Sequence, residues 1–153
     1  MDRLRIAVAL PHLGVYGGIR RFLELGRVWV ALGHEVTLAT PRDAKAREAW
    51  LPFEGRIGAV EDLARERWNA LISPDPALFL RAEAPGALRV FYAVLEKAPG
   101  AEEAWRRADV VLGNSSGIIR HLARRGIRAE DGVGGVNIAR FHPPASDARP
   151  DPP

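Results

Sequence analysis

The chain has 153 residues and a mass of 16.8 kDa, with 47% hydrophobic and 27% charged residues, a balance typical of one globular domain rather than a disordered chain. It contains no cysteine, which excludes a disulfide framework, a thiolate metal site and a cysteine nucleophile. No apolar run approaches the ~18 residues of a membrane span, and the amino terminus resembles no secretory signal. We therefore expect a cytoplasmic protein.

The charge is mildly basic, at +3, and it comes from 20 arginines and 2 lysines scattered along the chain. The arginine doublets are Arg20-Arg21, Arg106-Arg107 and Arg124-Arg125. A nucleic-acid-binding protein would carry a denser basic stripe interleaved with aromatic residues, so we expect no nucleic-acid partner. The excess positive charge is compatible with attraction to anionic ligands or with peripheral contact with an anionic membrane surface.

Short apolar runs alternate with amphipathic segments along the chain. In chain order we expect a strand at 5–10, a helix at 18–32, a strand at 35–39, a helix at 42–50, a strand at 56–60, a helix at 61–67, a strand at 70–73, a helix at 77–83, a strand at 88–94, a helix at 101–108, a strand at 109–112, a helix at 116–125 and a strand at 127–131. This alternation predicts an α/β fold, a Rossmann-like doubly wound parallel sheet with helices on both faces. We assign it to residues 1–142 and interpret the proline-rich residues 143–153 as a linker or tail.

Ligands of open parallel sheets bind beyond the carboxyl ends of the strands. His12, Gly17 and Gly18 follow the first predicted strand, and Asp75 follows the fourth. Glu96 follows the fifth predicted strand, and Asn114 and Ser115 follow the sixth. These residues are therefore the candidates for a binding or catalytic site.

The glycine pair at 17–18 opens the first long predicted helix. Two glycines there let backbone N–H groups approach an anion where the helix dipole favours negative charge. A tight turn for close helix–sheet packing explains them equally well. The loop is neither a G-x-G-x-x-G fingerprint nor a P-loop, and the second strand ends in Thr40 without a carboxylate for a ribose, which disfavours NAD binding.

Three segments resemble the amino-terminal domain of retaining GT-B glycosyltransferases of family 4. They are the double-glycine loop, helix and Gly-His-Glu-Val-Thr strand at 17–38, the alanine-aspartate strand with its asparagine-serine turn at 108–115, and the junction-like segment at 135–143. They follow the order and spacing of the family. The resemblance implies the acceptor-binding half of an enzyme that transfers sugar from a nucleotide-sugar, which is a substrate bound by a second domain rather than a cofactor.

The resemblance also implies roles for individual residues. The family usually carries a histidine near the end of the fifth strand; residues 92–97 have none, so Glu96 is the substitute candidate. The second candidate carboxylate, Asp75, follows from its place between two prolines at a strand end and not from the resemblance. The implied partners are a sugar, glycan or lipid acceptor and the nucleotide-sugar, and no residue requires a metal. Because the sequence ends at the junction, we expect no turnover by the isolated chain.

Structural roles compete with functional ones at most of these positions. His12 fits either acceptor binding or a surface polar group, and Asp75 fits either the site or a turn. Asn114 and Ser115 precede a helix, where capping explains them. Arg20 or Arg21 could reach a diphosphate, although one of the two must face solvent. His121 is predicted to lie on a solvated helix face.

A second function fits the same residues. A site at the carboxyl ends of the strands would also serve a stand-alone module that binds a phosphorylated sugar or nucleotide, or that pairs with a separate donor-domain chain.

Overall fold

The computed structural model describes residues 2–134, so the predicted junction at 135–143 and the proline-rich tail lie outside the described residues. The elements are β1 (Arg5–Ala9), α1 (Gly17–Ala31), β2 (Glu35–Thr40), β3 (Arg56–Ala59), the 3-10 helix η1 (Val60–Arg65), β4 (Ala70–Ser73), α2 (Pro76–Arg81), β5 (Leu88–Ala93), α3 (Ala101–Arg107), β6 (Val110–Gly113), α4 (Ser116–Ala123) and β7 (Glu130–Asp131). The α/β class expected from the sequence is confirmed.

The seven strands form one parallel sheet in the order β3-β2-β1-β4-β5-β6-β7. The strand order reverses beside β1, because β2 pairs with one edge of β1 and β4 with the other. Such a switch point opens a crevice at the carboxyl ends of the strands. The topology therefore brings together the loops that follow β1, β4, β5 and β6.

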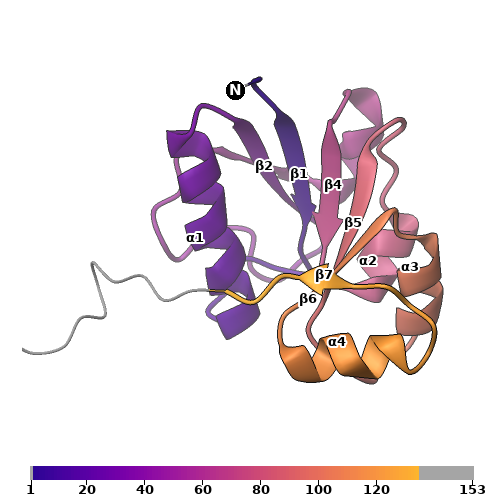
Figure 1. The fold of residues 1–153 in the computed structure, drawn as a ribbon. Helices are drawn as coiled ribbons and strands as arrows, with labels where there is room; N and C mark the ends of the chain where they lie inside the picture. Colours follow the sequence, from indigo (N-terminus) through magenta and orange to yellow (C-terminus); the bar gives the residue numbers. More distant parts are fainter. Residues whose placement is uncertain (1, 135–153) are drawn as a thin grey trace, which may run out of the picture.

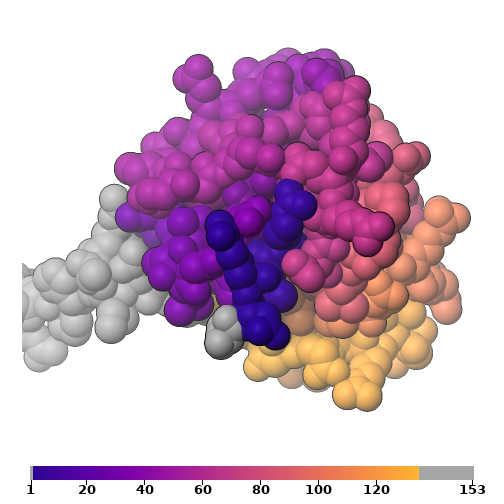
Figure 2. All heavy atoms as spheres, turned by 90° about the horizontal axis from the view of Figure 1, so that it is seen from above, coloured from indigo at the N-terminus to yellow at the C-terminus, as the bar shows by residue number. Residues whose placement is uncertain are grey.

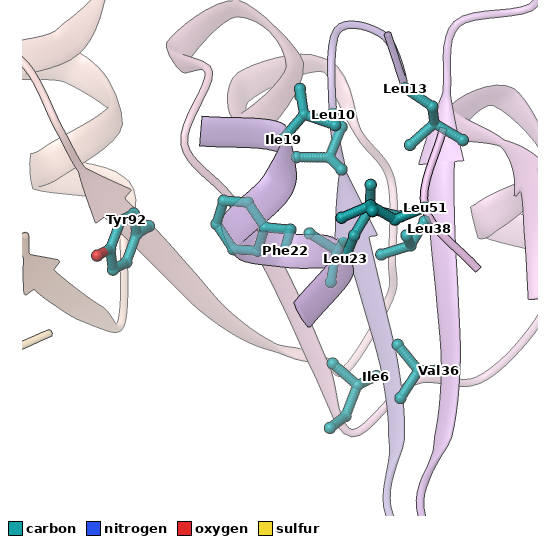
Figure 3. Close-up of a cluster of buried hydrophobic side chains, with 11 residues drawn as sticks. Ile6, Leu10, Leu13, Ile19, Phe22, Leu23, Val36, Leu38, Leu51 and Tyr92 are labelled. Atoms are coloured by element: carbon teal, nitrogen blue, oxygen red, sulfur yellow. The ribbon is translucent and has the colours of Figure 1, made fainter. Parts of the chain in front are cut away.

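Alternating strand residues pack on opposite faces of the sheet, as the two-residue period of a strand requires. On β1, Ile6 and Val8 belong to the cluster beneath α1 together with Phe22 and Leu23. Figure 3 shows Ile6, Phe22 and Leu23 of this cluster. Ala7 and Ala9 join the opposite cluster, which includes residues of η1 and α2. Figure 1 shows α1 on one side of the strands and α2 and α3 on the other.

Helix α1 ends through a glycine that adopts a left-handed conformation. Gly33 has φ +91°, its N–H donates to the carbonyl of Val30, and the N–H of His34 donates to that of Trp29. This is the double hydrogen-bond pattern of a Schellman end. The expected helix stop at Gly33 is therefore present.

Three predicted elements differ in the structure. The helix expected at 42–50 is wrong, since the segment forms turns and bends between Pro41 and Pro52. Two contacts with distant residues hold this segment instead. The carbonyl of Ala46 accepts a hydrogen bond from the N–H of Leu13, and Arg42 forms an ion pair with Asp62. The helix expected at 61–67 is a 3-10 helix, and the last strand is confined to β7. In the segment at 42–50, long-range contacts therefore outweigh the local helical pattern.

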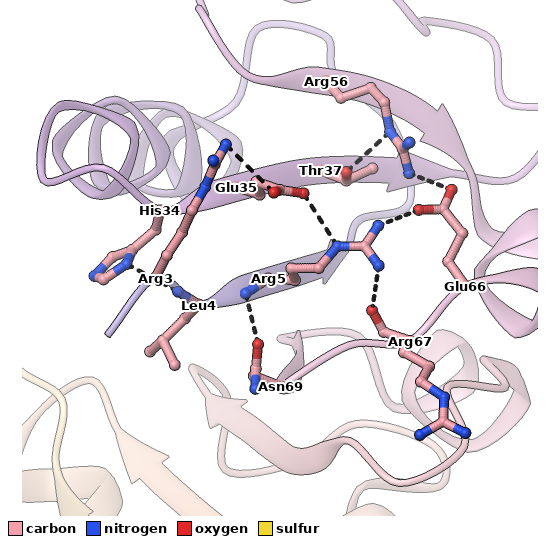
Figure 4. Close-up of polar contacts among 10 residues, drawn as sticks. All are labelled: Arg3, Leu4, Arg5, His34, Glu35, Thr37, Arg56, Glu66, Arg67 and Asn69. Atoms are coloured by element: carbon pink, nitrogen blue, oxygen red, sulfur yellow. Dashed lines mark hydrogen bonds and ion pairs between the residues drawn. The ribbon is translucent and has the colours of Figure 1, made fainter. Parts of the chain in front are cut away.

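The amino ends of the strands carry a network of ion pairs (Figure 4). Glu66 accepts from Arg56 at 2.5 Å and also from Arg5, which donates in addition to Glu35. The hydrogen bond from Arg56 lowers the pKa of Glu66 below its ordinary value, and the bond from Arg5 acts in the same direction against desolvation. Figure 2 looks onto this end of the molecule, with the first residues in indigo at its centre.

Candidate functional site

A cavity of about 680 Å³ lies at the carboxyl ends of the strands, within the range typical of small-molecule sites. Its walls come from the loop after β1, the first turn of α1, the segment joining β4 to α2, the end of β5 with the loop that follows, and Asn114. We call this cavity the crevice. Of the predicted site residues, it gathers His12, Gly17, Gly18, Arg21, Asp75 and Asn114, whereas Arg20, Glu96 and Ser115 do not line it.

The amino terminus of α1 opens into the crevice without a side-chain cap. Tyr16 occupies the N-cap position and makes no capping hydrogen bond, and the first turn contains no acidic residue. The first N–H groups of a helix lack partners within the helix, and the helix dipole makes that end positive. This end of α1 is therefore electrostatically suited to an anionic group.

The two glycines at this terminus are not required by packing. A Cβ atom added at Gly17 would meet nothing within 4 Å, and one at Gly18 would make only ordinary contacts with the Tyr16 ring, at 3.5 Å or more. Neither residue has a positive φ. The tight-packing explanation for the pair therefore has no support in the geometry.

His12 borders the same opening, with a defined hydrogen-bond arrangement. The N–H of Gly14 donates to its Nδ1 at 3.1 Å, and its ring lies edge-on to that of Tyr16 at 6.2 Å. Because Nδ1 accepts a hydrogen bond, the neutral imidazole carries its proton on Nε2. His12 therefore offers an N–H donor to a ligand oxygen rather than a bare nitrogen.

Arg21 is the cation of the crevice among the described residues. Its guanidinium lies 5.2 Å from the centre of the Tyr92 ring, and its Nη1 donates to the carbonyl of Gly132 at 3.3 Å. Arg20, in contrast, points to Glu24, with 3.8 Å between the charged groups. Arg21 is the member of the doublet that lines the crevice, and Arg20 does not line it.

The chain that follows β7 closes over Arg21 and Tyr92. The Tyr92 hydroxyl donates to the carbonyl of Gly132 at 2.8 Å, and a Cβ at Gly134 would come within 2.6 Å of the Arg21 guanidinium carbon. We call residues 132–134 the strap. Arg21 and Tyr92 are shared between the strap and the crevice, so the two are physically connected.

Asp75 and Ser115 both cap helices. The Asp75 carboxylate accepts from the N–H of Leu78 at 2.8 Å, and the Ser115 hydroxyl accepts from that of Ile118 at 3.3 Å. The capping expected of Ser115 is present, while Asp75 caps α2 and lines the crevice at once. Asn114 has a side-chain oxygen that is buried and has no hydrogen-bond partner.

Glu96 lies on the far side of the loop that follows β5. It borders a separate cavity of about 330 Å³, and its carboxylate lies 3.5 Å from Nδ1 of His121. The solvated position predicted for His121 is wrong: the residue is 8% exposed and packs edge-on against Trp105. The pattern failed because α3 covers this face of α4. Glu96 is thus engaged away from the crevice.

Several crevice residues were missed by the sequence analysis. Tyr16, Phe22, Tyr92 and Leu95 all line it. Tyr92 carried a signal, since its place in the strand sets it on the α1 face, opposite Phe91. Leu95 carried another, because it is a large apolar residue directly after a strand end.

Together, the sheet order and the crevice define a Rossmann-like α/β domain with a ligand-sized cavity at its switch point. No protein-family model, curated protein or solved structure matches this chain. Within residues 2–134, no helix is long and apolar enough to cross a membrane. The same residues contain no group of three or more histidine or acidic side chains that could hold a metal ion.

Proposed function

We propose that the chain is the acceptor-binding domain of a glycosyltransferase that uses a nucleotide-sugar donor. The observation that carries the proposal is the uncapped start of α1 at the crevice, where Gly17 and Gly18 are demanded neither by backbone conformation nor by packing. An anionic ligand gives a reason for both glycines, because it needs close access to backbone N–H groups.

In this function the acceptor hydroxyl forms the new bond to the anomeric carbon and loses its proton, and the nucleoside diphosphate leaves with the electrons of the broken bond and takes up that proton. The start of α1 and the guanidinium of Arg21 stabilise the charge that develops on the departing diphosphate. His12 donates from Nε2 to an oxygen of the bound ligands. Of the two candidate carboxylates, Asp75 lines the crevice, so we assign to it the hydrogen bond that the acceptor hydroxyl donates.

The test is a calorimetric titration of the chain with nucleoside diphosphates, using Gly17→Asp as the decisive variant. An aspartate in the first turn favours the helix by about 0.3–1 kcal/mol but repels an anion at the same point. We expect saturable binding by the wild type and at least about tenfold weaker binding by the variant, without loss of stability.

Ser116→Asp is the matched control, because it makes the same charge change in the first turn of α4, outside the crevice lining. It should bind nucleoside diphosphates nearly as well as the wild type. Equal weakening by both substitutions would show that net charge rather than the α1 terminus governs binding, and would contradict the proposal.

A further inference from the structure

The crevice offers few polar side chains for a ligand of its size. Among the described residues, the polar side chains that line it belong to His12, Tyr16, Arg21, Asp75, Tyr92 and Asn114. Four of the six already make one hydrogen bond within the protein, which reduces what they offer a ligand: His12 with Gly14, Asp75 with Leu78, and Arg21 and Tyr92 with Gly132. A free sugar exposes hydroxyl groups over its whole surface, and each one that is buried without a partner costs binding energy.

The remaining walls of the crevice are proline, aliphatic side chains, phenylalanine or glycine, and two of its lining residues are large hydrophobic side chains exposed to water. Tyr16, from the loop after β1, is 66% exposed, and Leu95, from the loop after β5, is 60% exposed. A single exposed leucine needs no explanation, but these two side chains stand on different loops and line one cavity. An apolar group seated between them would remove both from water.

We infer that the acceptor is amphiphilic, with an apolar moiety held in the crevice between Tyr16 and Leu95 and its reacting hydroxyl at the polar residues. The inference rests on the proposed function, and it names the class of acceptor. A cavity of about 680 Å³ accommodates one alkyl or aryl group together with a sugar-sized polar part. The cation of Arg21 and the start of α1 remain for the diphosphate.

A matched ligand series tests this inference on the full chain. Methyl, octyl and phenyl β-glucosides share one sugar and differ only in the apolar group, and their affinities can be measured by calorimetry or by NMR titration. We expect octyl or phenyl glucoside to bind at least about tenfold more tightly than methyl glucoside, because the added apolar area leaves water. The comparison of octyl with phenyl distinguishes alkyl from aryl acceptors.

The Leu95→Gln variant locates the effect, since glutamine keeps the length of the side chain but removes its apolar character. Leu88→Gln is the matched control, because Leu88 is 48% exposed at the start of β5, at the opposite end of the strand. The tighter binding of the apolar glucosides should fall several-fold in Leu95→Gln and persist in Leu88→Gln.

The outcomes also separate this inference from the proposed function. Equal affinities for the three glucosides, or equal losses in the two variants, would overturn the inference while leaving diphosphate binding at α1 intact. Preferential binding of the apolar glucosides without any binding of nucleoside diphosphates would uphold the apolar crevice and count against the glycosyltransferase.

Discussion

The hydroxyl of Tyr92 donates a 2.8 Å hydrogen bond to the carbonyl of Gly132, across 40 residues of sequence. The same carbonyl accepts from Arg21, whose guanidinium covers the Tyr92 ring. One carbonyl of the strap thus organises two side chains of the crevice. We expect a ligand that binds the Arg21 guanidinium to compete with its hydrogen bond to this carbonyl.

The two strap glycines should respond differently to an added methyl group. A Cβ at residue 132 would lie 2.9 Å from the Cβ of Leu112 and 3.0 Å from the Tyr92 ring. Because these atoms are held by the sheet, we expect Gly132→Ala to cost about 1–3 kcal/mol. At residue 134 the obstacle is the end of the Arg21 side chain, which can move. Gly134→Ala should therefore lower the free energy of unfolding by less than about 1 kcal/mol, as measured by urea denaturation. Equal losses in the two alanine variants would contradict the prediction that residue 132 is the more constrained of the two.

Alanine substitutions at the two ends of α1 should have opposite effects on stability. Gly17→Ala places a methyl group in open space and reduces the freedom of the unfolded chain, so stability should be unchanged or rise by up to about 1 kcal/mol. Gly33→Ala forces φ +91° on a residue with a side chain and should cost about 1–2 kcal/mol. The thermal midpoints of the two variants check this; a marked loss in Gly17→Ala would restore a structural reason for that glycine.

We expect Tyr16 to make the fold less stable than a capping residue would, while its ring forms part of the crevice wall. It occupies an N-cap position with extended backbone, at φ −160° and ψ 143°, yet makes no capping bond. Serine at this position would accept a hydrogen bond from the first turn, so Tyr16→Ser should raise the free energy of unfolding by about 0.5–2 kcal/mol. The same variant should lose affinity for phenyl glucoside. Denaturation and titration of one sample decide both points, and unchanged affinity would remove Tyr16 from the binding surface.

The network around Glu66 should make stability depend on pH in the acid range. The pKa of Glu66 is lower in the folded chain than its ordinary value of 4.5, so its ionised form contributes stability that is fully present above about pH 4.5 and is lost as the pH falls through the folded pKa. Glu66→Gln should therefore cost up to about 1 kcal/mol at pH 7, because the ion pairs are partly exposed to solvent, and progressively less below pH 4.5. Urea denaturation from pH 7 to pH 3 measures the difference; a gap that does not shrink in acid would contradict this account.

Much of the fold could be predicted because most elements carry complete local signals. The strand at 70–73 is an apolar run stopped by Pro74, and the helix at 17–31 has both its period and the stop at Gly33. The segment at 42–50 lacked such support. Its conformation depends on partners such as Leu13 and Asp62, which are distant in sequence.

The candidate site was predictable only where strand ends alone placed a residue. That rule located His12, Gly17, Gly18, Asp75 and Asn114 at the crevice. The same rule could not predict the direction of the Glu96 side chain. The Glu96 carboxylate lies beside His121, and the packing of α3 against α4 sets the position of His121. The strap was also beyond prediction, since its hydrogen bonds join Gly132 to Tyr92 and Arg21, 40 and 111 positions earlier in the sequence.

The most direct measurement is an NMR titration of the isotopically labelled chain with inorganic pyrophosphate. We expect saturable shifts of the backbone amide signals of Gly17, Gly18 and Ile19 and of the side-chain signals of Arg21. In Gly17→Asp these shifts should vanish. Shifts spread over the exposed arginines at the amino ends of the strands, with none at the start of α1, would contradict this expectation.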